Sequence, residues 1–309
     1  MESEQVWIGM QTMKDNRIFR VLGKQAVSGC MNGLNRCLFA LALVVLFGCK
    51  KPTDTQPGAV DIYSIMIGNK EIDQGGTIPY DLHEKLNHRV TIYINDNPIH
   101  STLETCILVI NPFIRPGENV VKIRSEGAQH IEVMATIGTS ALTVKERKYF
   151  QHGFNEQNNS FEYTFSAEIK HVYPVYKPEN QLSAITNRDD SLPLELVKSI
   201  ISLSENRRFD DAASLIIEGP RYWLPYAEKN YSSEWIQAFK ENFSSLCTSG
   251  GYHFQSYNPD EYIVEYGKSL ILIYRKDGGN AVFSSKYRNA PTIAAYIDGK
   301  YILWSCAPL

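Results

Sequence analysis

Apolar and polar residues alternate along short segments of the chain between Val60 and Val172, and turn-forming residues interrupt the alternation. Within Asn119–Arg124, Val121 and Ile123 fall on one face of an extended chain and Lys122 on the other, which is the period of a half-buried strand. Several such segments at regular spacing predict an all-β sandwich over residues 58–173. The expected strands are Val60–Ile67, His88–Ile94, Thr105–Ile110, Asn119–Arg124, His130–Ile137, Leu142–Tyr149 and Phe161–Val172.

After a polar, proline-punctuated stretch at 174–191, which we interpret as a linker, the period changes to that of helices. Leu194, Val197 and Ile200 follow helical spacing, Phe209–Ile216 forms a second short helix, and Ser232 or Ser233 caps a third. Strands then follow, so we predict an α+β domain over 192–309, with helices packed on a curved antiparallel sheet. The expected strands are Tyr252–Tyr257, Tyr262–Tyr266, Leu270–Tyr274, Ala281–Tyr287, Thr292–Ile297 and Tyr301–Trp304, with hairpin turns at Asp277–Asn280 and Asp298–Gly299.

The run Leu38–Phe47 is apolar throughout but too short for a bilayer core, which needs about 20 residues. It is typical of the apolar region of a signal peptide. The residues that follow, Leu46-Phe47-Gly48-Cys49, resemble the lipobox of bacterial lipoproteins. The resemblance implies cleavage before Cys49 and attachment of palmitate-type lipid chains to that cysteine, which hold the protein on a membrane. Residues 1–48 are then a signal region and 49–57 a lipidated tether.

Two further expectations follow from this start. Residues 1–30 make the signal unusually long, so we hypothesise that Met31 is the true start. Lys50 occupies the place where many lipoproteins of the inner membrane carry aspartate. By that resemblance we expect a lipid-anchored protein of the bacterial cell envelope, at the outer membrane.

One passage in the predicted sandwich is more specific. Residues Ile92–Ile99 contain an apolar strand that ends in an Asn-Asp-Asn-Pro turn, and Ile110–Arg124 contains Pro116-Gly117 before an alternating strand. This pattern resembles jelly-roll sandwiches of the galactose-binding-like kind, with an immunoglobulin-like sandwich as the alternative. We expect Asn119 to hydrogen-bond the turned backbone. By this pattern none of these residues is a sugar ligand.

The order of elements in the second predicted domain, helices followed by an antiparallel sheet, resembles the cone of nuclear-transport-factor-like and ketosteroid-isomerase-like proteins. That resemblance implies a pocket between helices and sheet. Many members of this superfamily are enzymes, and many only bind or dimerise.

Charge excludes one class of partner. The 309 residues are 43% hydrophobic and 21% charged, with a formal net charge of -3. Removing residues 1–48 leaves 26 basic against 31 acidic side chains. Because phosphate neutralisation supplies much of the affinity for nucleic acids, we expect no nucleic-acid partner.

The sequence contains no catalytic or metal-binding motif with the required spacing. His83 and His88 lie five residues apart, whereas a helical zinc site needs two histidines four apart. We therefore expect no metal, no cofactor and no catalytic residue. Acidic pairs such as Asp210-Asp211, Asp189-Asp190 and Asp260-Glu261 are interpreted as helix caps and solvated faces. His253 with Glu261 or Glu265 remains an alternative acid–base pair.

Aromatic residues and cysteines supply the remaining candidates. The segment 221–226 and the helix after it are rich in aromatics, which suit a ligand or partner contact as well as a buried core. The candidate contacts are Tyr222, Trp223, Tyr226, Trp235 and His253. Cys247 and Cys306 are candidates for a disulfide in an oxidising compartment, whereas Cys106 lies in an apolar strand and is expected to be a buried thiol.

Together these patterns favour a non-enzymatic, membrane-anchored envelope lipoprotein that binds a small ligand or an envelope protein. An enzyme with a pocket in the cone-like domain and carbohydrate binding through the sandwich remain the alternatives.

Overall fold

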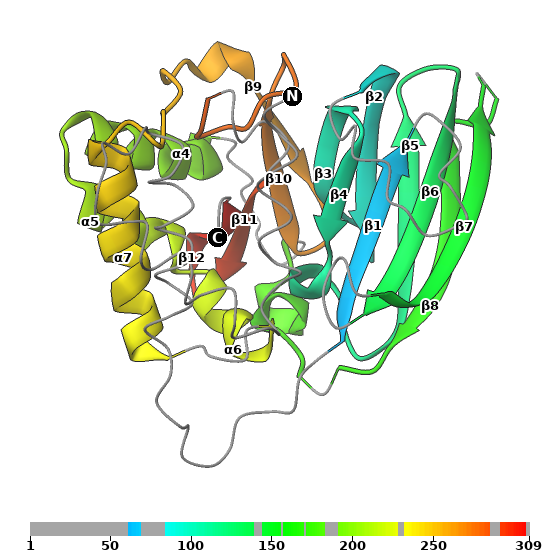
Figure 1. Cartoon of the computed structure of the whole chain (residues 1–309), viewed down its shortest axis with the longest axis horizontal. Helices are drawn as coiled ribbons and strands as arrows, with labels where there is room; N and C mark the ends of the chain where they lie inside the picture. Colours follow the sequence, from blue (N-terminus) through cyan, green and yellow to red (C-terminus); the bar gives the residue numbers. More distant parts are fainter. Residues whose placement is uncertain are drawn as a thin grey trace, which may run out of the picture. The chain divides into compact units, whose positions relative to one another are not determined.

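The computed structural model describes residues 61–68, 84–138, 144–155, 157–169, 171–182, 191–227, 232–284 and 291–306 (Figure 1). Pro52–Leu309 forms one compact unit. The predicted signal region, the proposed start at Met31, the lipobox with Cys49 and the tether all lie outside the described residues.

The first part of the compact unit, residues 61–182, contains two four-stranded antiparallel sheets, as the alternating pattern predicts. Their strand orders are β4-β1-β6-β7 and β3-β2-β5-β8. Val121 and Ile123 are fully buried while Arg124, on the opposite face of β5, is exposed, which confirms the predicted facing. The strands are β1 (Ile62–Gly68), β2 (Lys85–Ile94), β3 (Asn97–Glu104), β4 (Cys106–Val109), β5 (Gly117–Ser125), β6 (Gln129–Gly138), β7 (Val144–Phe154) and β8 (Ser160–Ala167).

Strand β3 is absent from the sequence prediction, which read Asn95–Pro98 only as a turn. Asn95 and Asp96 have φ angles of 50° and 64°. Asn and Asp tolerate this left-handed region, and two such residues form the tight turn of a β-hairpin. The chain therefore leaves the turn directly into a strand that starts at Asn97. Its polar residues His100, Ser101 and Thr102 are all buried, so no alternation marks the strand.

The second part, residues 191–306, has helices followed by an antiparallel sheet, as predicted, and the sheet has four strands in the order β12-β11-β10-β9. Ser232 caps α7, because its side chain accepts a hydrogen bond from the Trp235 backbone N–H. The elements are α4 (Ser191–Glu205), α5 (Phe209–Ile216), α6 (Leu224–Ala227), α7 (Ser233–Thr248), β9 (Tyr262–Tyr266), β10 (Leu270–Arg275), β11 (Thr292–Ile297) and β12 (Lys300–Cys306).

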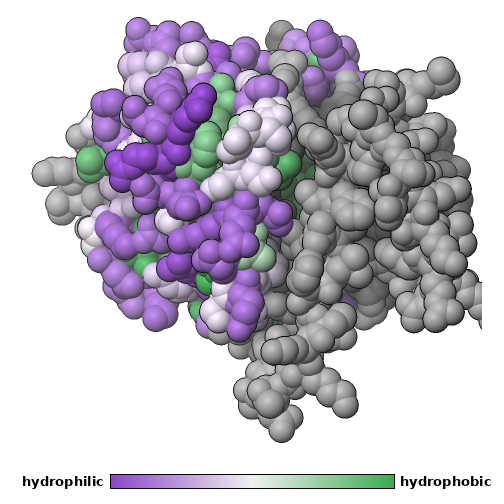
Figure 2. Space-filling model, turned by 60° about the vertical axis from the view of Figure 1, so that its left-hand side comes forward, coloured by the Kyte–Doolittle hydropathy of each residue, from purple (hydrophilic) through white to green (hydrophobic). Residues whose placement is uncertain are grey.

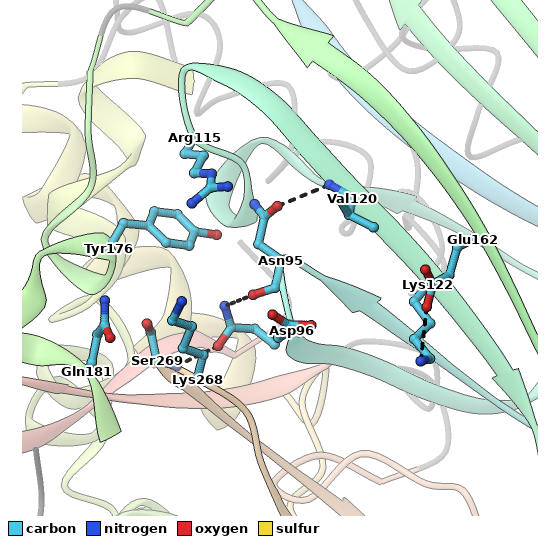
Figure 3. A pocket seen from close by; sticks show the side chains of 11 residues that line it. Asn95, Asp96, Arg115, Val120, Lys122, Glu162, Tyr176, Gln181, Lys268 and Ser269 are labelled. Carbon is cyan, nitrogen blue, oxygen red and sulfur yellow. Dashed lines mark hydrogen bonds and ion pairs between the residues drawn. The ribbon is translucent and has the colours of Figure 1, made fainter. Parts of the chain in front are cut away.

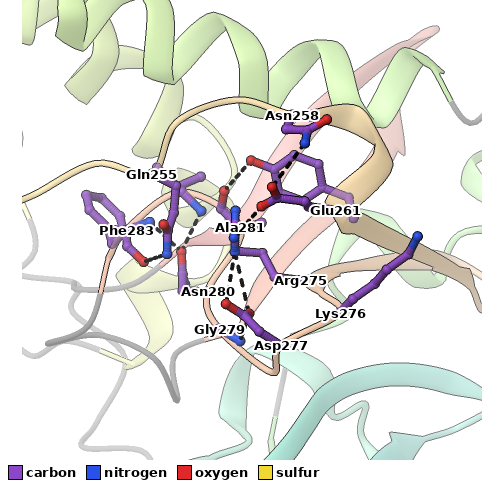
Figure 4. Close-up of polar contacts among 12 residues, drawn as sticks. Gln255, Asn258, Glu261, Arg275, Lys276, Asp277, Gly279, Asn280, Ala281 and Phe283 are labelled. Atoms are coloured by element: carbon purple, nitrogen blue, oxygen red, sulfur yellow. Dashed lines mark hydrogen bonds and ion pairs between the residues drawn. The ribbon is translucent and has the colours of Figure 1, made fainter.

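Two predicted strands are wrong. Residues 252–257 form no strand, and the described part of Ala281–Tyr287 makes one isolated bridge, between Phe283 and Phe254. The physical reason is Asn280, whose side-chain oxygen accepts from the Val282 and Phe283 backbone N–H groups at 2.7 and 2.8 Å. These two N–H groups are therefore not available to hydrogen-bond a neighbouring strand. Figure 4 shows this polar cluster.

The sheet β9–β12 is buried on both faces. Ile271 and Ile273 belong to an apolar cluster with α4, α5 and α7, whereas Leu272 and Trp304 belong to the core of the two sheets of the first part. On the side that carries the helices, the surface is mostly hydrophilic with hydrophobic residues showing between (Figure 2), and Leu192 there is 45% exposed.

The described part of the predicted linker is packed. It forms two short 3-10 turns, η2 (Pro174–Tyr176) and η3 (Pro178–Asn180), and Val175 and Leu182 are fully buried. Proline and asparagine gave this stretch the composition of a linker, but its two apolar side chains insert into the two core clusters. The structure therefore shows a β-rich part and an α+β part, and the division into two separate domains is not confirmed.

Candidate functional site

The aromatic residues predicted as ligand contacts lie largely in the core. Trp223 is 8% exposed, and its indole N–H donates to the Trp304 carbonyl at 2.9 Å. Trp304 is fully buried and donates to the Pro112 carbonyl at 3.0 Å, across to the first part. Tyr222 stacks on Trp304, and Tyr173 meets it edge-on. We call Tyr173, Tyr222, Trp223 and Trp304 the aromatic plug; it is a packing feature.

The other predicted contacts do not come together either. Trp235 is half-buried and stacks on Phe239 within α7, and the side chain of Tyr226 lies outside the described residues. His253 is exposed. Glu261 pairs with Arg275 instead, and Glu265 accepts from Tyr93, so neither carboxylate is placed to work with His253 as an acid–base pair.

The three described cysteines are free thiols. Cys106 is 3% exposed, as expected for a buried thiol, and burial raises its pKa to about 12. Cys306 is fully buried, with its sulfur 3.9 Å from the Thr292 hydroxyl oxygen. The candidate disulfide between Cys247 and Cys306 is therefore not formed in this structure, although both side chains belong to the same apolar cluster.

A polar cleft of about 180 Å³ opens where the β2–β3 turn, the residues before β5, the turns η2 and η3, and the β9–β10 turn meet. This volume is below the roughly 300–1,000 Å³ of clefts that hold drug-sized ligands, so the cleft suits one small polar group. Its principal side chains are those of Asp96, Arg115, Tyr176, Gln181, Lys268 and Ser269.

The wall that carries Arg115 is held by Asn119. The Asn119 side chain accepts from the Arg115 backbone N–H at 2.9 Å and donates to the carbonyls of Arg115 and Gly117 at 2.8 and 2.9 Å. This confirms the prediction that Asn119 bonds the turned backbone. Asn95 joins the same network, because its amide donates to the Asn119 side-chain oxygen at 2.7 Å.

Asn97 joins the floor of the cleft to the α+β part through two hydrogen bonds. Its side-chain oxygen accepts from the backbone N–H groups of Ser269 and Leu270 at 2.6 and 3.0 Å. Gly267 permits this approach, since a Cβ at that position would lie 2.5 Å from Pro98 Cδ. Lys268 and Ser269 are thus fixed against the β2–β3 turn.

Cationic and hydroxyl groups converge on the cleft (Figure 3). The Arg115 guanidinium, the Tyr176 phenol and the Asn95 amide point toward one another, and Lys268 approaches from the opposite side. The Tyr176 hydroxyl donates to the Phe113 carbonyl, and burial raises the pKa of this phenol. Lys122 and Glu162 lie apart and pair with each other at 3.0 Å.

A second, much smaller cavity of about 10 Å³ lies beside His100, which is roughly the space of one water molecule. His100 is 3% exposed, and its Nε2 has no hydrogen-bond partner among the described residues. Burial lowers its pKa to about 4. Asn280 and Thr292 also line this cavity.

Within the described ranges, no group of three His, Cys, Asp or Glu side chains is placed to hold a metal ion. No helix in the same ranges is long and apolar enough to cross a membrane.

Sequence reasoning missed the polar cleft. Its principal side chains come from four separated segments, and polar residues in turns look like ordinary solvated positions. One available signal was the density of Asn residues at 95, 97 and 119, since three amide side chains around turns indicate fixed backbone geometry.

A scan of the chain against protein-family models finds no match, and a search of curated proteins finds no significant relative. The functional argument therefore rests on the sequence, the fold and the cleft.

Proposed function

We propose that this protein is a lipid-anchored lipoprotein of the bacterial cell envelope that binds a small polar ligand in the cleft between its β-rich and α+β parts, without catalysing a reaction. The observation that carries the proposal is the cleft itself. Its walls are fixed by Asn97 and Asn119, while Arg115, Lys268 and Ser269 face it. Fixed walls with convergent polar groups favour binding, because little ordering is needed when the ligand arrives.

A lipid anchor is supported by the apolar run Leu38–Phe47, the cysteine that follows it and the polar tether, and Lys50 after that cysteine favours the outer membrane. Expression of the full chain in a bacterial host, followed by mass spectrometry of the membrane fraction, tests this. We expect a mature chain that begins at lipid-modified Cys49, and a Cys49→Ser variant that keeps its signal. The mass of that unprocessed variant also distinguishes a start at Met31 from a start at Met1. An unmodified wild-type Cys49 contradicts the anchor.

For the fold we propose the finer assignment of a jelly-roll sandwich followed by a cone-like domain. The two sheets with a shared core and the Pro116-Gly117 turn bonded by Asn119 support the first. The second is supported by element order alone. The helix-facing side of β9–β12 is filled by apolar side chains such as Ile271 and Phe283, which speaks against an acid–base pocket there.

Ligand binding is tested by thermal unfolding of the mature chain against neutral, acidic and phosphorylated monosaccharides and amino acids. A ligand at 100 times its Kd stabilises the folded state by about 2.7 kcal/mol, and the midpoint temperature rises accordingly. Gln181→Trp fills the cleft and should abolish the shift. Gln237→Trp, at an exposed position on α7, should retain it. If no member of the panel raises the midpoint, or if Gln181→Trp leaves the shift intact, the proposal fails.

A further inference from the structure

The open hydrogen-bonding groups of the cleft comprise two cationic donors, Arg115 and Lys268, one acceptor, the Asp96 carboxylate, and two groups that can both donate and accept, the Gln181 amide and the Ser269 hydroxyl. Among the described residues, the Lys268 amine, the Gln181 amide and the Ser269 hydroxyl have no hydrogen-bond or ion-pair partner. Arg115 uses only its Nε, which donates to the Glu118 carbonyl at 3.3 Å, so its two terminal nitrogens are open. Ser269 is 2% exposed, so its hydroxyl is buried against the cleft. A ligand that satisfies this set must present oxygen acceptors to the two cations and a hydrogen-bond donor to Asp96.

The charge of the cleft selects among such ligands. Lys122 and Glu162 neutralise each other. Of the remaining charged side chains, Arg115 and Lys268 are cations and Asp96 is an anion. The cleft is therefore left with one positive charge. A monoanion balances it, whereas a dianion such as phosphate meets repulsion from Asp96.

Resting on the proposed function of ligand binding, we infer that the cleft takes a small monocarboxylate that carries hydroxyl groups, the chemistry of a sugar acid. The carboxylate lies between Arg115 and Lys268, because a guanidinium offers paired donors that match a carboxylate. Asp96 accepts from the ligand hydroxyls, and Gln181 and Ser269 donate to its remaining oxygens. The volume of about 180 Å³ accommodates one such unit.

Isothermal titration calorimetry of the mature chain with glucuronate and with glucose measures how much the carboxylate contributes to the affinity. Charge-assisted hydrogen bonds contribute enough that glucuronate should bind at least roughly tenfold more tightly than glucose. Arg115→Gln and Lys268→Gln should each remove most of this difference. The matched controls Arg221→Gln and Lys148→Gln lie at exposed positions outside the cleft and should preserve it.

Asp96→Asn supplies an independent readout. Asparagine tolerates the φ of 64° at this position, so the turn is retained while the anion is lost. Inorganic phosphate, which should bind the wild-type protein weakly, should bind this variant more tightly, and glucuronate should lose its preference over acetate. A purely structural role for Asp96 would not reverse the order of anions.

The outcomes separate this inference from the proposed function. If glucose binds as tightly as glucuronate, or phosphate binds the wild-type chain more tightly than either, the cleft still binds a ligand but the sugar-acid inference is overturned. Failure of glucuronate, galacturonate and N-acetylmuramate to bind at millimolar concentration also overturns it, whichever other ligand binds.

Discussion

The aromatic plug and the polar cleft both lie where the β-rich part meets the α+β part, but the plug consists of aromatic side chains and the cleft is lined by polar and charged ones. In the plug, Trp304 is fully buried and its indole N–H meets a backbone carbonyl. In the cleft, contact depends on Asn97 and its two backbone donors, and charged side chains remain exposed beside it. The contacts that stabilise this junction and the groups left open for a ligand therefore belong to different residues.

The largest expected effect is at the plug. Trp304→Ala removes a fully buried indole and leaves a cavity, which should lower the free energy of unfolding by about 3–5 kcal/mol. Chemical denaturation monitored by circular dichroism measures this. Trp235→Ala, at a half-buried position on α7, should cost clearly less. Equal losses of stability for the two variants would contradict a special stabilising role for the aromatic plug.

The next effect is a dependence on pH that comes from His100, on the strand that begins at Asn97. Its folded-state pKa of about 4 lies below the unfolded value, so the stability it confers is complete above pH 6.5 and is lost as pH falls toward 4. The unfolding free energy should fall by about 3 kcal/mol over this window. Urea titrations at both pH values should show a smaller fall in His100→Gln. Identical pH profiles would show that this histidine does not titrate as a buried group.

In the polar cleft, Asn97→Ala leaves the Ser269 and Leu270 backbone N–H groups without their acceptor. Because water from the cleft can replace part of the loss, we expect a cost of about 2 kcal/mol. Ligand binding should also weaken, since Lys268 and Ser269 are no longer fixed. Asn158→Ala, at an exposed position, is the control. A change in stability without any change in ligand binding would show that the Asn97 hydrogen bonds stabilise the fold but do not shape the cleft for its ligand.

The smallest expected effect is that of Gly267→Ala. The added Cβ would lie 2.7 Å from Asn97 Cα, so the β2–β3 turn must shift, at a cost of about 1–2 kcal/mol. Gly153→Ala adds the same group on β7, where no atom lies within 4 Å, and should be nearly neutral. Thermal melts of the two variants measure the difference. If both melt alike, the close approach at Gly267 does not constrain the junction.

Local pattern predicted much of the fold. Strand β9 and helix α5 were predicted with their observed ends, because a short run of β-branched and aromatic residues and a helical spacing of apolar residues are properties of a single element. Strand β3 escaped because both of its faces are buried by different neighbours. Residues 281–284 were misread because an asparagine side chain, rather than a strand, takes their backbone donors.

The sequence alone was enough to predict the β-rich part, the helices followed by a sheet, the role of Asn119 at its turn and the burial of Cys106. Each depends on interactions within a few residues or on the hydrophobicity of one segment. The three-dimensional structure was needed to show that Trp223 belongs to the core, that the stretch after Tyr173 is packed, and that Arg115 and Lys268 face one cleft. These facts depend on contacts between residues far apart in the chain, 81 positions for Trp223 with Trp304 and 172 for Asn97 with Ser269, and no local periodicity records which distant segments will meet.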